Sequence, residues 1–403
     1  MNKVIFLVDM NSFFISCEAT RHPEIAGRPA AVAGDPKNRT GIILTANYEA
    51  RKFGVKTTMV IHESLKLCPN MQLIPPDHHF YEQKSREVME ILSCYTPVIE
   101  QNSIDEAWLD MTGCEGIFGK PSMSANRIMN QLKNELGLCC SIGISENKFL
   151  SKMASEMKKP LGITELWKND IEIKLWPLPI QSMYGVGKQT AQKLRSMGIE
   201  TIGDLGQFNR DQLTKKLGKF GTEIHQLANG IDISRVISRS ENDIKSIGRS
   251  ITLTKDIFDI ECAKIILIKL ADEVGTSARK YDKKGRTVQL NIKYSNFKNI
   301  TRQATLPATN LTKEIYSSAI DLLQKNWDKE LPIRLLGLSL SGFSKDSPIE
   351  QLSMFKMSEV SPSKEKLEKL EKLENTIDDI REKYGSSIIN RAVLIKKDIK
   401  EKK

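Results

Sequence analysis

The sequence lacks the cysteine and histidine patterns of disulfide-bonded and zinc-binding domains. Its seven cysteines include one adjacent pair, Cys139-Cys140, but no CxxC pair, and its five histidines show no ligand spacing. An odd cysteine count in a chain of this size favours reduced thiols over a disulfide framework and argues against zinc. The sequence also has no secretory signal before its first predicted strand and no apolar run long enough to span a bilayer. We therefore expect a cytoplasmic protein without a membrane partner.

An excess of basic residues indicates the kind of partner to look for. Lysine and arginine together number 60 against 50 acidic residues, which gives a formal net charge of +10. Such a balance suggests a polyanionic partner, first of all a nucleic acid, although many basic proteins bind none. The 403 residues have room for about two to four domains, each with its own core. No internal repeat is evident.

Hydrophobic periodicity divides the chain into two α+β regions joined by a helical one. The first region, up to residue 162, predicts strands at 3–8 and around 98–110, and helices over 81–95, 124–136 and 148–157. Short helices separated by glycines follow to residue 229, and a second α+β region covers 240–343. Its predicted strands and helices are 247–253, 286–294 and 335–340, and 261–280 and 312–327. From residue 345 the chain is polar, with a helical pattern over 364–380 that predicts a tail without a core.

Carboxylates at the ends of apolar strands are the most informative pattern. An apolar strand ends at Asp9, and the run Ser103-Ile104-Asp105-Glu106 lies in a second half-buried strand. Alternation sends Asp105 and Glu106 to opposite faces of that strand. An acid at the end of an apolar strand is costly unless it meets a cation. Two such strands side by side would gather three carboxylates suited to two divalent ions and phosphoryl transfer, although structural acids at strand ends are equally typical.

Two further groups of residues suit a nucleotide. Tyr48 and Arg51 share a predicted helix face, with Thr45 one turn earlier, and form a row of donors for phosphate oxygens. An exposed amphipathic helix face explains the same pattern, and Lys159 before Pro160 is an ordinary loop cation by itself. Of the aromatic pair after the first acid, Phe13 is expected in the core. The Phe14 ring is expected above the carboxylates, where it would stack under a sugar and exclude a 2′-hydroxyl.

Other patterns point to nucleic acid. The segment Gly185-Val186-Gly187-Lys188 has the form of a helix-hairpin-helix, whose backbone N–H groups approach a phosphate without reading sequence. The second α+β region is basic, and its charges either form a solvated surface or, on an exposed sheet face, grip a duplex. The residues expected to do so are Arg249, Lys255, Lys283, Lys284 and Arg286.

One short apolar run stands in the polar tail. Gln351-Leu352-Ser353-Met354-Phe355 has two aliphatic side chains and an aromatic ring close together. The arrangement suits a linear peptide that docks into a hydrophobic pocket on a partner. Isolated apolar residues in a tail also occur without any such role.

Taken together, these motifs resemble the Y-family of translesion DNA polymerases over about the first 345 residues, in the same order. The subgroup that it resembles most is the bacterial DNA polymerase V/IV-like catalytic proteins of Gram-positive bacteria, plasmids and phages, which the tail motifs at 378–385 and 390–392 support. The matching motifs are Val8 to Phe14, Tyr48 to Val55, Ser103 to Glu106, and Asn147-Lys148 with Lys159 to Gly162.

The resemblance implies residue roles that composition and spacing do not establish. Asp9, Asp105 and Glu106 would hold two Mg²⁺ ions, with the Met10 carbonyl completing one site. Thr45, Tyr48, Arg51 and Lys159 would hold the triphosphate of a dNTP, beside Phe13, with Phe14 as the steric gate. Residues 185–188 would hold a DNA backbone phosphate, and residues 351–355 would bind the replicative sliding clamp, with Met354 where leucine is usual.

The fold that the resemblance implies is a multidomain α+β right hand. Its parts are a palm (1–10 and 78–166), small fingers (11–77), a helical thumb (167–235), an α+β little finger (240–345) and a flexible tail (346–403). The expected activity is low-fidelity, template-directed DNA synthesis on primer–template DNA by a monomer, because no length is left for a proofreading exonuclease. A recombinase or accessory SOS proteins are further candidate partners. The alternatives are a DNA-binding accessory protein with little activity of its own, and a nucleotide cyclase on a similar palm.

Overall fold

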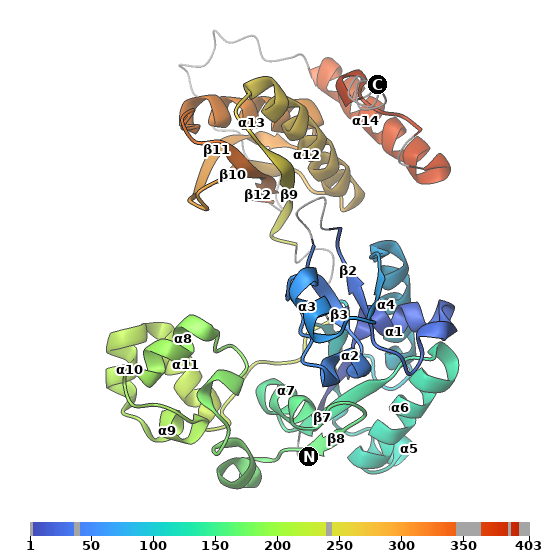
Figure 1. Cartoon of the computed structure of the whole chain (residues 1–403), viewed down its shortest axis with the longest axis vertical. Coiled ribbons are helices and arrows are strands. Elements are labelled where there is room, and N and C mark those ends of the chain that lie inside the picture. The colour runs from blue at the N-terminus through green and yellow to red at the C-terminus, as the bar shows by residue number, and fades with distance from the viewer. Residues whose placement is uncertain (1–2, 36–40, 239–243, 344–363, 386–387, 395–403) are drawn as a thin grey trace. The chain divides into compact units, whose positions relative to one another are not determined.

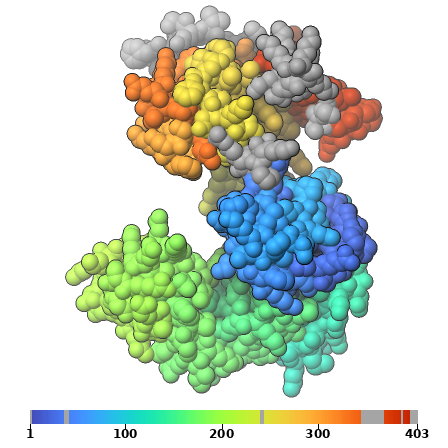
Figure 2. Space-filling view, in the orientation of Figure 1, coloured from blue at the N-terminus to red at the C-terminus, as the bar shows by residue number. Residues whose placement is uncertain are grey.

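The computed structural model describes residues 3–35, 41–238, 244–343, 364–385 and 388–394. They fall into two compact units, one before residue 239 and one after residue 240. Figures 1 and 2 show the chain as ribbon and as space-filling atoms, and the second view shows closely packed side chains in each unit. Among the described residues, no helix is both long and apolar enough to cross a membrane. The predicted clamp motif at 351–355 lies outside these ranges.

A five-stranded sheet forms the centre of the first unit. Its order is β5-β6-β1-β7-β8, with β1 (Ile5–Met10) in the middle. The neighbours of β1 are β6 (Glu106–Asp110) and β7 (Cys140–Ser145), both antiparallel to it. The edges are β5 (Ile99–Gln101) and β8 (Ile163–Glu165). The β1 sequence IFLVDM is buried throughout, as expected for an apolar strand flanked on both sides.

Helices cover both faces of this sheet. Phe6, Val8 and Met10 share one core with helices α1 (Phe13–Arg21), α4 (His78–Ser93) and α6 (Pro121–Leu136). In Figure 1, α1 and α4 lie beside each other. Helix α7 (Lys148–Met157) contacts β7 and β1. The predicted helices of this region are confirmed within a few residues at their ends.

Helix α7 lies unusually close to the sheet because of one glycine. A Cβ atom added to Gly143 of β7 would lie 2.0 Å from the backbone oxygen of Ser151 in α7. Gly143 pairs with Leu7, so it lies on the same face of the sheet as Leu7 and Asp9. The missing side chain lets the α7 backbone rest directly on β7.

A smaller sheet and a helical segment complete the first unit. Strands β2 (Ala30–Ala33), β3 (Ile43–Ala46) and β4 (Gln72–Ile74) form the sheet. It packs with α2 (Tyr48–Lys52) and α3 (Ile61–Leu67), and short α5 (Glu115–Phe118) precedes α6. The helical segment holds α8 (Lys188–Arg195), α9 (Ile202–Gln207), α10 (Arg210–Leu217) and α11 (Lys219–Ala228), after short helical turns at Lys168–Asp170, Ile171–Leu175 and Ile180–Ser182. Another short turn, Pro23–Ile25, lies between α1 and β2. Its core includes Phe149, Leu150 and Met153 of α7, which therefore joins it to the large sheet.

The second unit is a four-stranded antiparallel sheet with two helices on one face. The strand order is β11-β10-β12-β9, formed by β9 (Ser246–Ile257), β10 (Gly285–Tyr294), β11 (Asn299–Thr309) and β12 (Ile333–Ser341). Helices α12 (Ile260–Lys280) and α13 (Thr312–Asn326) share its core. Strand β11 was not predicted, because its many polar residues hide the alternation of apolar and polar side chains.

The expected free tail is wrong for its helical part. Helix α14 (Lys364–Tyr384) exists where the periodicity predicts it, but it docks on α12 through charged residues. Arg279, with 4% of its side chain exposed, contacts Glu374 at 3.2 Å and Asp378 at 2.5 Å. Arg381 contacts Asp272 of α12 at 2.8 Å. The docked face of α14 is therefore its charged face, which a search for apolar stripes does not reveal.

We predict that Gly143→Ala destabilises the first unit by about 3 kcal/mol, because the new methyl group meets backbone that cannot rotate away. Urea unfolding followed by tryptophan fluorescence measures the effect. Gly116→Ala is the matched control, since a Cβ there meets nothing within 4 Å. Equal loss of stability in both variants would contradict the close-approach explanation.

Candidate active site

Two of the predicted carboxylates, Asp9 and Glu106, lie opposite each other on neighbouring strands. Asp9 of β1 is the direct antiparallel partner of Glu106 of β6. Residues paired in this way project to the same face, with Cβ atoms about 5 Å apart. Asp9 is only 8% exposed. Two carboxylates held so close in a buried place repel each other unless a cation lies between them.

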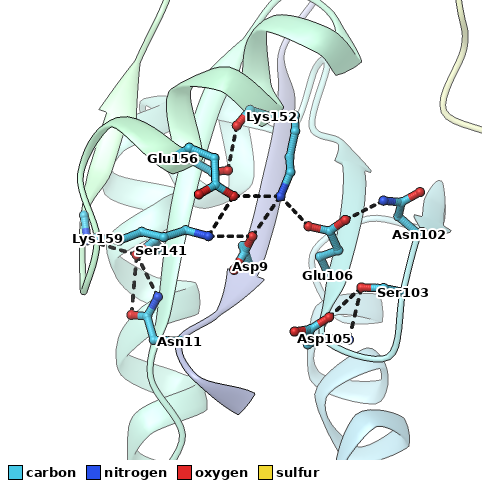
Figure 3. A network of polar contacts seen from close by, with 12 residues as sticks. Asp9, Asn11, Asn102, Ser103, Asp105, Glu106, Ser141, Lys152, Glu156 and Lys159 are labelled. Carbon is cyan, nitrogen blue, oxygen red and sulfur yellow. Dashed lines mark hydrogen bonds and ion pairs between the residues drawn. The ribbon is translucent and has the colours of Figure 1, made fainter. Parts of the chain in front are cut away.

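Lysines from α7 and the loop after it supply that positive charge (Figure 3). The Lys152 ammonium donates to Asp9 Oδ2 at 3.0 Å and to Glu106 Oε2 at 2.6 Å. Lys159 lies 2.8 Å from the same Asp9 oxygen. Glu156 Oε1 accepts from Lys152 and Lys159, each at 2.9 Å. The five side chains form one network of alternating charge.

The network sets the protonation of Asp9. Burial by itself raises the pKa of this carboxyl, but the ammonium charges of Lys152 and Lys159 outweigh burial and hold the pKa below its usual value of 3.8. Asp9 is therefore ionised at neutral pH. An ionised carboxylate is the form that ligates a divalent cation.

Asp105 does not lie where strand alternation predicts. Strand β6 begins at Glu106, and Asp105 belongs to the preceding bend, so the expected opposite faces of one strand are corrected. Its Oδ1 accepts from Ser103 Oγ at 2.6 Å, while its backbone oxygen accepts from Met10 N at 2.9 Å. The bend keeps the Asp105 backbone beside β1.

The carboxylates suit a metal without forming a closed metal cage. Within the described residues, no three acidic, histidine or cysteine side chains converge as metal ligands. An ammonium bridges Asp9 and Glu106 instead, and Asp105 is adjacent to Glu106 in the chain. Paired carboxylate oxygens around one cation are the donor set that Mg²⁺ prefers, so these residues fit the expected ion.

The turn between β1 and α1 adds unused polar groups that sequence reasoning missed. Ser12 has a left-handed backbone (φ 48°), and its Oγ is buried with no hydrogen-bond partner in the structure. No side chain caps the N-terminus of α1. Asn11 donates to Ser141 Oγ at 2.9 Å and accepts from Leu161 N at 2.9 Å, which fixes the loop that carries Lys159. The start of α1 therefore has backbone N–H groups without a side-chain cap, close in the chain to Asp9, and such a helix start stabilises an anion.

Phe14 is held by an aromatic stack. Its half-buried ring lies 4.4 Å from the Tyr81 ring, with an interplanar angle of 13°. The Tyr81 hydroxyl donates to Glu18 at 2.6 Å, and Arg21 neutralises this buried carboxylate at 2.8 Å. Phe13 is in the core, as predicted, with 3% exposure. The Phe14 ring therefore rests on a fixed support.

The predicted donor row is only partly helical. Helix α2 begins at Tyr48, with Asn47 as its N-cap, whereas Thr45 belongs to β3, so its expected place on the helix is wrong. The Arg51 guanidinium lies 5.1 Å from the centre of the Tyr48 ring. Burial raises the pKa of Tyr48, while Arg51 and Lys159 oppose the shift. Tyr48 and Arg51 do share a face.

The glycine pair of the predicted hairpin lies in open space. Gly185 has φ +88°, and a Cβ on either Gly185 or Gly187 would meet nothing within 4 Å. Val186 between them is buried and anchors the turn. Gly187 is the N-cap of α8, whose first residue is Lys188. The geometry leaves room for a phosphate at the start of α8.

The predicted basic sheet face is corrected for three of its five residues, because Arg249 lies on the helix side and Lys283 and Lys284 precede β10 and lie in no strand. Arg249 pairs with the buried Leu338, so it points to the helix side, and it contacts Ser277 of α12. Lys284 contacts Glu371 of α14 at 2.7 Å. Lys255, Lys283 and Arg286 lie at the end of β9 and around the irregular start of β10.

The strand register shows what lies on the open sheet face. Cross-strand partners share a face, and the partners opposite the helix side are mostly short and uncharged. They are Ser246, Gly248, Ser250 and Thr252; Thr287, Gln289, Asn291 and Lys293; Asn299, Thr301, Gln303 and Thr305; and Leu335, Gly337, Ser339 and Ser341.

Several residues of the site were not found from the sequence. Lys152 and Glu156 follow Lys148 at four-residue steps along α7, a spacing that places all three on one helix face. That signal was available, but surface ion pairs produce it as well. Tyr81, Glu18 and Gly143 carry no local signal, because their roles depend on contacts with distant segments.

The chain matches protein-family models, curated proteins and a solved structure. Residues 8–156 match the impB/mucB/samB family, residues 244–354 match its C-terminal domain, and residues 181–232 match the DNA polymerase-iota thumb domain. A DNA polymerase IV of Clostridium kluyveri is 68% identical over 98% of this chain and 99% of its own. One of Alkaliphilus oremlandii is 58% identical over 98% and 100%. A solved chimeric Y-family DNA polymerase matches with a TM-score of 0.74 and 25% identity over 84% of this chain and 99% of its own.

The chain belongs to the Y-family of translesion DNA polymerases, with the α+β polymerase fold of a thumb and a sheet-based little finger. Its activity is that of a DNA-directed DNA polymerase, and its substrates are primer–template DNA and dNTPs. The predicted likeness to bacterial DNA polymerase IV is confirmed by relatives of that name, whereas the likeness to polymerase V-like proteins stays a prediction.

The lowered pKa of Asp9 predicts an acid dependence of stability in the metal-free protein. Ionised Asp9 stabilises the fold above its unfolded pKa near 3.8, and this contribution is lost as pH falls through the lower folded pKa. Asp9→Asn lacks the titrating group, so its melting temperature should fall less steeply than that of the wild type between about pH 5 and pH 3. Thermal melts in EDTA measure both slopes, and parallel curves would contradict the expectation.

Proposed function

We propose that this polymerase transfers nucleotides with two Mg²⁺ ions held by Asp9, Asp105, Glu106 and the Met10 carbonyl. The observation that carries the proposal is the ammonium of Lys152 between Asp9 and Glu106, 3.0 and 2.6 Å from their oxygens. When bound, such ions activate the attacking hydroxyl and neutralise charge on the triphosphate. Asp9 and Glu106 already lie opposite each other on neighbouring strands. Asp105 would complete the ligand set by giving up its hydrogen bond to Ser103.

The chain supplies its own cations and N–H groups for the triphosphate. Lys159 lies at the Asp9 end of β1, and Arg51 and Tyr48 share one face of α2. The uncapped start of α1 lies next in the chain to β1, and Thr45 is the second-last residue of β3 in the smaller sheet. Guanidinium, ammonium and backbone N–H groups would orient the phosphates for in-line attack, which is the main task of a nucleotidyl transferase.

Phe14 is proposed as the steric gate, with the buried Phe13 beside it. The Phe14 ring is fixed against Tyr81 at 4.4 Å and cannot retreat without breaking that stack. A ring so supported leaves no space for a 2′-hydroxyl. The sugar selection therefore depends on the support as well as on Phe14 itself.

We propose that two surfaces bind DNA. Residues 185–188 present the open N-terminus of α8 to a backbone phosphate. The open face of the second sheet is rich in Ser, Thr, Asn and Gln, which let a phosphate backbone approach the strands closely. Lys255, Lys283 and Arg286 would add charge at the rim, and Arg249 and Lys284 would act from the helix side.

The remaining parts follow the same reading. We propose the palm, fingers, thumb and little finger boundaries of the sequence analysis, although α1 shares its core with β1. We also propose a monomeric, cytoplasmic, low-fidelity enzyme that tolerates damaged templates and docks on the sliding clamp through residues 351–355. A recombinase or accessory SOS proteins are candidate partners. The ammonium-bridged carboxylates favour an enzyme over a DNA-binding accessory protein, and the helix-hairpin-helix disfavours a cyclase.

Primer extension with Mg²⁺ tests the metal assignment. Asp105→Ala should reduce extension by at least about a thousandfold while primer–template binding stays within about twofold, because the proposed DNA contacts lie on other elements. Asp110→Asn is the matched control, since Asp110 lies at the other end of β6 and accepts from Thr112 N. Extension by Asp105→Ala at the control rate would refute the metal role. A wild-type chain that binds DNA but extends nothing would favour the accessory alternative.

Sugar selection tests the gate and its support separately. Phe14→Ala should raise ribonucleotide incorporation by about a hundredfold, and Tyr81→Leu, which removes the stacked ring, by about tenfold. Tyr81→Phe keeps the ring and loses only the hydrogen bond to Glu18, so it should stay near wild type. Relative kcat/KM for rNTP and dNTP measures the effect. An unchanged ratio in Phe14→Ala would remove the gate role.

A further inference from the structure

The proposed metal site already contains a cation that belongs to the chain. Lys152 Nζ bonds Asp9 Oδ2 and Glu106 Oε2, the same two carboxylates that the metal proposal assigns as ligands. Lys159 takes the same Asp9 oxygen at 2.8 Å. The other oxygen of Glu106 accepts from the Asn102 amide. The inward carboxylate oxygens are therefore already occupied by N–H donors.

We propose that Lys152 is a resident counter-cation which metal ions must displace. The inference rests on the proposed metal function and adds a competitor to it. A divalent ion and an ammonium at the same oxygens repel each other, and the Lys152 side chain is only 10% exposed. Its charge balances Asp9 and Glu106 before metal arrives, so that two buried carboxylates never stand unpaired.

Glu156 provides the place to which the displaced ammonium moves. It lies one turn after Lys152 on α7 and already accepts from it at 2.9 Å. Its side chain is 48% exposed and also accepts from Lys159 at 2.9 Å, so its charge is paired or hydrated wherever the Lys152 ammonium lies. A small rotation about the lysine stem would therefore let the ammonium give up Asp9 and Glu106 to the metal ions and keep its existing salt bridge to Glu156. Glu156 is thus a positioning residue for Lys152.

The close packing of α7 makes this arrangement possible. Gly143 lets the Ser151 backbone rest on β7, and Ser151 immediately precedes Lys152. Gly143 pairs with Leu7 of β1, and Leu7 is two residues before Asp9. Gly143 and Asp9 therefore lie on the same face of the sheet. A more distant helix would hold the ammonium away from both carboxylates. The counter-cation is therefore built into the packing of the sheet.

Manganese binding without DNA or nucleotide tests the proposal on the full chain. Free Mn²⁺ is measured by EPR during titration of metal-free protein. Because competition is a coupling, Lys152→Met should bind Mn²⁺ about tenfold more tightly than wild type. Glu156→Gln should bind it several-fold more weakly, since the displaced ammonium loses its acceptor. Lys148→Met is the matched control, because Lys148 on the same helix pairs with Glu100 at 2.7 Å and should leave the affinity unchanged.

Thermal stability provides a second readout. In EDTA, Lys152→Met should melt at a lower temperature than wild type, and saturating Mn²⁺ should stabilise it by a larger increment. If this variant does not fold without metal, Lys152→Gln should show the same increase in Mn²⁺ affinity. Equal or weaker Mn²⁺ binding by the neutral variants would overturn the proposal and would instead make Lys152 a support for the ligands.

One further variant separates this inference from the proposed function. Asp9→Asn should weaken Mn²⁺ binding if the metal site is where we place it. If Asp9→Asn and wild type bind Mn²⁺ equally, the metal assignment itself fails. If Asp9→Asn binds weakly but Lys152→Met gains nothing, only the counter-cation fails.

Discussion

The repulsion between Asp9 and Glu106 is the constraint on which the active site depends. Antiparallel pairing of β1 and β6 fixes the two carboxylates side by side, and burial of Asp9 denies them the screening of water. Such a pair is costly to bury without a cation between its members. In this structure the cation is Lys152, and its position depends in turn on α7 lying directly on β7 at Gly143. The carboxylates of the proposed metal site are thus also the buried charges that a cation must balance for the sheet to be stable.

Residues outside the proposed nucleotide site hold Phe14 and Lys159 in place. Phe14 rests on Tyr81, Tyr81 is fixed by the buried Glu18, and Arg21 neutralises Glu18. The loop of Lys159 is tied to β1 by the Asn11 amide. Since such supports have locked positions, the proposed gate and the proposed triphosphate cation need little rearrangement when substrate binds.

Most residues on the open sheet face of the second unit are uncharged, and Lys293 is an exception. Small hydroxyl and amide side chains line that face, whereas Arg249 and Arg279 lie toward the helices. Arg279 is part of an ion-pair network that docks α14 on α12. Basic composition therefore predicted a nucleic-acid partner correctly in class, but composition does not tell where each charge lies. Arg249 is on the helix side with Ile247 and Ile251, and Lys284 precedes β10.

The sequence by itself determined the α+β class, most of the helices, the acids at the strand ends and the family. These features depend on local periodicity and on motifs that are contiguous in the chain. Tertiary structure decided that Asp9 opposes Glu106, that Asp105 precedes its strand, and that Lys152 lies between the carboxylates. It also decided that α14 is anchored by its charged face. These facts depend on strand register and on contacts between segments that are distant in the sequence. The position of each buried charged side chain depends on where its partners lie, and local sequence does not contain that information.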